Sequence, residues 1–163
     1  REKGKLGVLM LSGGEPTIRS DLPELIEKLL PLNINRIMIN TNGRRIVRDP
    51  AFLQFIKEHR DRIEVYLQFD GFRPETYQAL RNEDLAEEKQ KALELLNESG
   101  IFTTLVCTVA KGINDDEVGK ILLKGLELPF CSGAAIQPVF GSGRGRGIDP
   151  LDRVTPTGVL KRL

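Results

Sequence analysis

The sequence has few residues that hold metals, no excess of charge and no long apolar run. Its 163 residues include two cysteines, Cys107 and Cys131, and one histidine, His59, which cannot assemble a zinc site from soft ligands. The 24 basic and 23 acidic residues nearly balance, so the chain lacks the excess positive charge that would attract nucleic acid. No apolar run reaches the roughly 18 residues of a membrane span. We therefore expect no nucleic-acid partner and no membrane span.

The two ends of the sequence have features of a piece cut from a longer protein. The charged residues 1–5 lead almost directly into a strand pattern, without the long apolar core of a signal peptide. Residues 159–163 have the pattern of a helix that is only beginning. We expect an incomplete single domain over residues 1–163, in which residues 141–163 form a loop and a helix start, and a cytoplasmic location.

Apolar segments alternate with segments of helical periodicity along the chain. Strand patterns rich in β-branched residues cover 6–12, 36–41, 63–70, 101–110 and 134–139. Helical patterns cover 22–30, 50–59, 74–81, 84–99 and 114–126. Ser20 or Asp21 is the expected N-cap of the first helix, and Asn114 that of the last.

The strand patterns indicate an α/β fold. Residues 8–11 and 36–40 are apolar at nearly every position, which predicts parallel strands covered on both faces. Strands joined through helices of this length require crossover connections. The expected architecture is therefore part of a (βα) barrel or a doubly wound sheet.

Polar residues gather where each predicted strand ends, which is where parallel sheets bind ligands. After the first strand, Gly13 and Gly14 leave the backbone bare and Glu15 adds a carboxylate. Such a group suits a cation such as an α-ammonium. A tight turn with a surface glutamate is the simpler interpretation, and the Asn-Gly and Asp-Gly pairs at 42–43 and 70–71 are also ordinary turn dipeptides.

These strand ends, taken in order, resemble the radical S-adenosylmethionine (SAM) enzymes. The motifs are Gly13-Gly14-Glu15-Pro16, Thr41-Asn42-Gly43 and Gln68-Phe69-Asp70-Gly71. Residues 107–117 are similar to a stretch of molybdenum-cofactor biosynthesis protein A, and residues 68–77 and 137–143 resemble the tetraether-lipid-synthase-like branch. The resemblance covers residues 7 to 147 and implies a partial (βα) barrel of parallel strands with outer helices, lacking its first βα unit.

The resemblance also implies a set of SAM-binding residues. Gly13, Gly14 and Glu15 would hold the methionyl amino group, and Thr41 and Gln68 the polar groups of the methionyl or ribose part. Thr104 occupies the position that in relatives reaches the SAM carboxylate, although relatives often carry a longer cationic or polar side chain there. Ile136 and Gln137 match the strand whose backbone borders the adenine. Asp70 would act behind the SAM site or on the substrate side.

The sequence departs from the family pattern in its cysteines. The family binds a 4Fe–4S cluster through Cys-x3-Cys-x2-Cys, and no such triplet occurs here. The resemblance therefore implies that the cluster ligands lie upstream of residue 1. The complete enzyme would reductively cleave SAM to a 5′-deoxyadenosyl radical that abstracts hydrogen from an unidentified small-molecule substrate, whereas this fragment alone would be inactive.

Other interpretations stay open at this point. One is a phosphate-binding (βα) barrel enzyme in which Arg144 and Arg146, set among glycines, supply a cationic loop. Another is a barrel that serves as a scaffold without catalysis. If a strand is missing, the strand that begins at Leu6 has an exposed edge, which predicts that the fragment associates with itself.

Overall fold

The computed structural model describes residues 4–139 and 151–161. Its strands are β1 (Leu6–Leu11), β2 (Ile34–Thr41), β3 (Ile63–Gln68), β4 (Thr103–Val109) and β5 (Cys131–Pro138). Its helices are the 3-10 helix η1 (Pro16–Ile18), α1 (Leu22–Leu29), α2 (Arg44–Arg48), α3 (Pro50–Glu58), α4 (Pro74–Arg81), α5 (Ala86–Glu98), α6 (Val118–Glu127) and α7 (Pro156–Leu160). No helix in these described ranges is long and apolar enough to cross a membrane. The predicted basic loop with Arg144 and Arg146 lies outside them.

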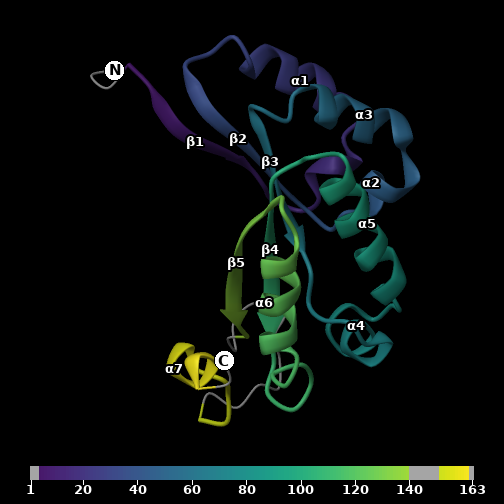
Figure 1. Ribbon diagram of the computed structural model, residues 1–163, viewed down its shortest axis with the longest axis vertical. Helices are drawn as coiled ribbons and strands as arrows, with labels where there is room; N and C mark the ends of the chain where they lie inside the picture. Colours follow the sequence, from purple (N-terminus) through teal and green to yellow (C-terminus); the bar gives the residue numbers. More distant parts are fainter. Residues whose placement is uncertain (1–3, 140–150, 162–163) are drawn as a thin grey trace.

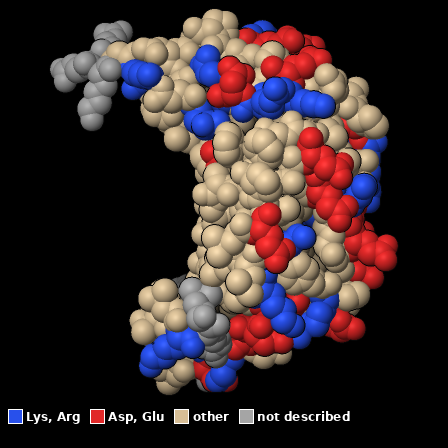
Figure 2. All heavy atoms as spheres, in the orientation of Figure 1, with Lys and Arg blue, Asp and Glu red and all other residues tan. Residues whose placement is uncertain are grey.

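All five strands belong to one parallel sheet, in the order β1-β2-β3-β4-β5. Figure 1 shows α1, α2, α3 and α5 on one side of this sheet, and Figure 2 shows a crescent-shaped outline with a hollow side. The sheet is thus a half-barrel with outer helices, which confirms the predicted partial barrel. Because the strands are parallel, their carboxyl ends form one rim.

One face of the sheet is buried under the helices and the other is open. On β2, Ile37 and Ile39 are fully buried on the helix side, whereas Met38 points the other way and is only half-buried. On β1, Val8 and Met10 are 49% and 42% exposed. The prediction that these strands are covered on both faces is therefore wrong for the described residues. Within residues 4–139 and 151–161, no helix layer covers the inner face of the open half-barrel.

Local side-chain contacts decide where the helices begin. Asp49 caps α3 by accepting a hydrogen bond from the Phe52 amide at 3.1 Å, just before Pro50. At α1, Asp21 holds the N-cap position but makes no capping bond, because its carboxylate binds the Arg19 guanidinium at 2.7 Å. Asp21 is therefore the N-cap residue of α1, which is one of the two predicted alternatives, but its side chain does not cap the helix.

The largest difference from the predicted elements concerns Asn114, which does not begin a helix. Its side-chain amide donates to the carbonyls of Asp70 and Thr108, at 2.7 and 2.8 Å, so it binds strand ends together. The helix begins only at Val118. The sequence patterns also missed η1 and α2, which are short and lie directly after β1 and β2.

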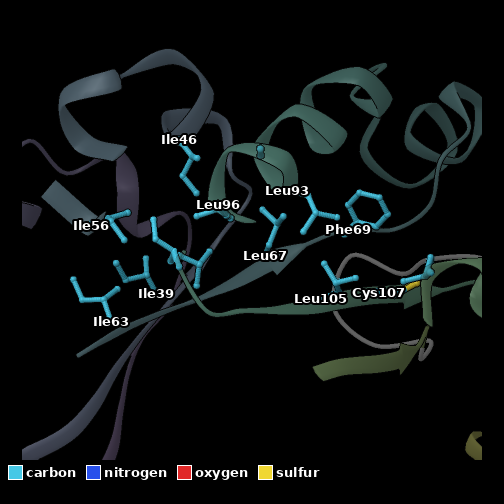
Figure 3. Packing of buried hydrophobic residues seen from close by; sticks show 14 of the residues in the cluster. Ile39, Ile46, Ile56, Ile63, Leu67, Phe69, Leu93, Leu96, Leu105 and Cys107 are labelled. Carbon is cyan, nitrogen blue, oxygen red and sulfur yellow. The ribbon is translucent and has the colours of Figure 1, made fainter. Parts of the chain in front are cut away.

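A large apolar cluster lies between the sheet and the helices (Figure 3). Ile39 and Leu67 contribute from the strands, and Leu93 and Leu96 from α5; none of these side chains is more than 2% exposed. The cluster includes Leu105 and Cys107 on β4. This packing supports the strand ends from the helix side.

We expect Ile39→Ala to lower the free energy of unfolding by about 2–5 kcal/mol, because it removes buried methyl groups and leaves a cavity. Leu123→Ala is the control, since Leu123 is 62% exposed. Urea unfolding of both variants and the parent measures the effect. Equal losses in the two variants would contradict the placement of the core.

Candidate functional site

The loop after β1 presents bare backbone at the rim. Gly13 and Gly14 adopt φ values of +98° and +56°, which favour glycine, and a Cβ at either position would meet nothing within 4 Å. A cleft of about 360 Å³ borders this loop and is also lined by Glu15 and by Leu22 and Leu25 of α1. The space beside the α-carbons of both glycines, where a side chain would project, is thus open.

The carboxylate of Glu15 is oriented by four hydrogen bonds. Oε1 accepts from the hydroxyls of Thr17 and Thr41, both at 2.7 Å, and from the Thr17 amide at 3.1 Å. Oε2 accepts from the Asn42 amide at 2.6 Å. Among the described residues Glu15 forms no ion pair. Oε1 is therefore fully used, whereas Oε2 has capacity for a further donor.

Thr41 contacts Glu15 from the helix-facing side of β2. It pairs with Leu67 in the sheet and shares the helix-facing side of β2 with Ile39, and it is only 1% exposed. Its hydroxyl also accepts from the Gly43 amide at 3.1 Å. The structure therefore brings Thr41 and Glu15 together as the sequence predicts, through a direct bond between them. A direct contact of Thr41 with SAM stays a prediction.

Gln68 lies at the end of β3 on the inner face, in register with Val106 of β4. It is not among the donors to Glu15. Thr104 also faces inward, and its hydroxyl donates to Glu64 at 2.8 Å and lies 3.1 Å from the Ser132 hydroxyl. Thr104 is thus already engaged with its neighbours on β3 and β5.

The two predicted residues on β5 face opposite ways. Gln137 pairs with Thr108, on the inner side, and is exposed. Ile136 pairs with Cys107 and packs against the apolar cluster, so only its backbone borders the inner face. The resemblance likewise implies that the backbone of this strand, rather than its side chains, borders the adenine.

Asn40 is a candidate that the sequence analysis missed. It pairs with Tyr66 on the inner side of β2, and its Oδ1 atom is buried without a hydrogen-bond donor among the described residues. The available signal was a polar residue that alternates with the buried Ile37, Ile39 and Thr41 near the end of the strand. An acceptor without a donor suits a hydroxyl or ammonium group of a ligand.

Asp70 is fully enclosed rather than open to a substrate. Its carboxylate accepts from the Arg81 guanidinium at 2.8 and 3.1 Å and from the Thr108 amide at 2.9 Å. Arg81 also donates to the Thr108 hydroxyl at 3.1 Å. This ion pair binds the ends of β3 and β4 to α4, and so Asp70 supports the rim from behind.

Lys89 of α5 is a buried cation beneath the same rim. It is 2% exposed, and its Nζ atom donates to the Asn42 carbonyl. Burial lowers the pKa of its ammonium from 10.5 to about 8. The Arg81 charge also lowers this pKa, whereas the charges of Asp70, Glu15 and Glu88 oppose the shift.

The cysteines do not fit an iron–sulfur cluster. Cys107 is buried, and burial raises the pKa of its thiol to about 12, which disfavours the thiolate that iron requires. Cys131 lies on β5, and the described part of the chain contains no group of three cysteine, histidine or carboxylate side chains that would hold a metal ion.

The sequence matches the model of the radical SAM superfamily over residues 1–124. The chain belongs to the radical SAM superfamily. Within it, the chain is 36% identical over 138 residues to the 7,8-dihydro-6-hydroxymethylpterin dimethyltransferase of Methanocaldococcus jannaschii, covering 83% of this chain and 27% of that protein. It is 31% identical to a probable GTP 3′,8-cyclase of Methanothermobacter thermautotrophicus, over 69% of this chain and 36% of that protein. The radical SAM chain thus spans about a third of these relatives.

The fold agrees with this assignment. The structure of anSMEcpe with bound AdoMet superimposes with a TM-score of 0.60, at 23% identity, over 88% of this chain and 42% of that one. This chain therefore shares its half-barrel fold with that structure.

We expect Lys89 to make a contribution to stability that rises between about pH 8 and 10.5, whereas the buried Cys107 thiol, whose pKa is raised, contributes in the opposite direction. In that range the unfolded chain binds a proton at Lys89 that the folded chain has released, so the contribution of Lys89 to the free energy of unfolding increases with pH. Lys89→Met should remove this rise, whereas Lys91→Met, on the same helix and 54% exposed, should retain it. Urea unfolding from pH 7 to 10.5 measures the difference, and identical slopes in all three proteins would contradict it.

Proposed function

We propose that this chain is the larger part of the SAM-binding half-barrel of an enzyme that reductively cleaves SAM. In the complete protein, a 4Fe–4S cluster would supply one electron to the sulfonium of SAM, and the cleavage would release methionine and provide a 5′-deoxyadenosyl radical to take a hydrogen atom from a small-molecule substrate. The observation that carries the proposal is the Glu15 carboxylate, which is oriented at the rim beside two open glycine peptides in a radical SAM chain. The cytoplasm is the proposed location.

The chemistry of the rim fits the amino-acid part of SAM. Oε2 of Glu15 has room for an ammonium donor, and a charge-assisted hydrogen bond is stronger than a neutral one. We propose that the carbonyls of Gly13 and Gly14 add acceptors, because no side chain lies within 4 Å of where a Cβ would stand at either glycine. Along the inner face, Asn40 offers its unpartnered oxygen, and the amide of Gln68 follows one strand further on. We propose that Thr41 acts through Glu15, because its hydroxyl is enclosed.

For the rest of the ligand we propose the inner face of β4 and β5. The backbone at Ile136 and Gln137 borders the space that the adenine would take. Thr104, which is bonded to Glu64, contributes to the polar surface next to this space. Its assignment to the SAM carboxylate stays a prediction.

We propose that the ligands of the 4Fe–4S cluster lie upstream of residue 1. Cys107 and Cys131 are the only cysteines of the sequence, and neither is part of a triplet. The isolated chain would then bind no cluster and would not cleave SAM. The experiments on SAM below therefore use the complete protein that contains this chain.

The arrangement favours SAM over a phosphorylated substrate. Glu15 places negative charge at the rim position where a phosphate would need a cation. In a thermal-shift assay, SAM should raise the melting temperature of the complete protein and a sugar phosphate should leave it unchanged. The opposite result would favour the phosphate-binding alternative, and no shift with either compound would favour a scaffold.

We expect Glu15→Ala to weaken SAM binding by roughly 1.5–3 kcal/mol, the range for a hydrogen bond to a charged group. Isothermal titration calorimetry on the complete protein measures it. Glu24→Ala is the matched control, because Glu24 is exposed on the neighbouring helix α1. Unchanged affinity in Glu15→Ala would refute the proposed ligand site.

We also propose that the isolated chain associates with itself through β1. Among the described residues β1 pairs only with β2, and Leu6, Val8 and Met10 are exposed. Light scattering should show dimers or larger species that grow with concentration. Val8→Lys should reduce them, since a lysine on an edge strand opposes pairing. A concentrated parent chain that stays monomeric would rule this out.

A further inference from the structure

Lys89 is connected to Glu15 through one residue of the turn after β2. The Lys89 ammonium donates to the carbonyl of Asn42, and the amide of Asn42 donates to Oε2 of Glu15 at 2.6 Å. Lys89 comes from α5, on the helix side of the sheet, whereas Glu15 follows β1. Asn42 therefore links α5, through Lys89, to the carboxylate of Glu15 at the rim.

The burial of Lys89 is energetically unfavourable. A buried ammonium loses its hydration, and this loss is repaid only by close partners. Among the described residues no carboxylate forms an ion pair with Lys89; the carboxylate of its neighbour Glu88 binds Arg44 and Arg48 instead. Its hydrogen-bond partner is a backbone carbonyl. A methionine of similar length would fill the space without a buried charge, but it would leave the Asn42 carbonyl without this donor.

The turn that Lys89 holds is packed tightly against α5. Gly43 adopts φ +81°, and a Cβ there would lie 2.6 Å from Cδ1 of Leu67 and 3.2 Å from Cβ of Ala92. Ala92 lies three residues after Lys89, on the same face of the helix. The turn thus rests on Ala92 at Gly43 and is bonded to Lys89 at Asn42, which leaves its amides little freedom to move.

We propose that Lys89 is a positioning residue for ligand binding, which keeps the Asn42 amide directed at Glu15 and thereby fixes the carboxylate that receives the ammonium of SAM. The side chain is 2% exposed and does not reach a ligand itself. This role rests on the proposed function of Glu15.

The test compares two ligands in the complete protein. SAM carries the amino-acid group, whereas 5′-methylthioadenosine has a similar nucleoside without that group. We expect Lys89→Met to weaken SAM binding up to about tenfold, the equivalent of one positioned hydrogen bond, and to leave 5′-methylthioadenosine binding unchanged. A merely structural role would weaken the binding of both ligands. Lys91→Met, an exposed change on the same helix, should alter neither.

A double-mutant cycle distinguishes the proposed role of Lys89 from the proposed ligand site at Glu15. If Lys89 acts through Glu15, Lys89→Met should have no further effect on SAM affinity once Glu15→Ala is present. Normal affinity in Glu15→Ala alone refutes the proposed ligand site. Reduced affinity in Glu15→Ala with normal affinity in Lys89→Met overturns only the role of Lys89. Additive losses also overturn it.

A second variant covers the case in which Lys89→Met does not fold. Lys89→Gln keeps a polar end on a shorter side chain, and circular dichroism with urea unfolding reports whether either variant is folded. We expect a smaller loss of SAM affinity in Lys89→Gln, again without an effect on 5′-methylthioadenosine. Wild-type affinity for SAM in folded Lys89→Gln, or equal losses for both ligands, would overturn the proposal.

Discussion

The bond between Glu15 and the end of β2 is the interaction on which the rest of the site depends. Within the loop, the amide and hydroxyl of Thr17 bind the Glu15 carboxylate. The hydroxyl of Thr41 and the amide of Asn42 then fix this carboxylate against the end of β2. Adjacent parallel strands place these groups side by side at their carboxyl ends. The order of the strands in the sheet thus places the donors that orient the Glu15 carboxylate.

Behind the rim, buried charges connect the strand ends to the helices. Asp70 and Arg81 bind β3 and β4 to α4, while Lys89 binds the turn after β2 to α5. Asp70 and Lys89 are both buried, at 0% and 2% exposed. Buried charged side chains such as Asp70 and Lys89 therefore hold the backbone at the strand ends. Partly exposed polar side chains such as Gln68 remain at the open inner face, where a ligand could bind.

The open inner face explains the mixture of residues along the strands. Helix-facing positions such as Ile39 and Leu67 are fully buried, whereas inward positions such as Asn40 and Gln68 are polar and partly exposed. In a half-barrel this face surrounds the space where a ligand would lie, so polar groups can be retained there. On β1, apolar inward residues such as Val8 remain exposed because no described element packs on them.

The amino-acid sequence by itself determined the alternation of strands and helices, the ring of polar strand ends and the membership suggested by Gly13–Pro16, because apolar periodicity and short motifs are local properties. Only the tertiary structure decided which way each side chain points. It enclosed Thr41 and Asp70, left Asn40 without a partner and used Asn114 to join strand ends instead of starting a helix. These outcomes depend on strand register and on contacts between residues distant in sequence, which no local pattern encodes.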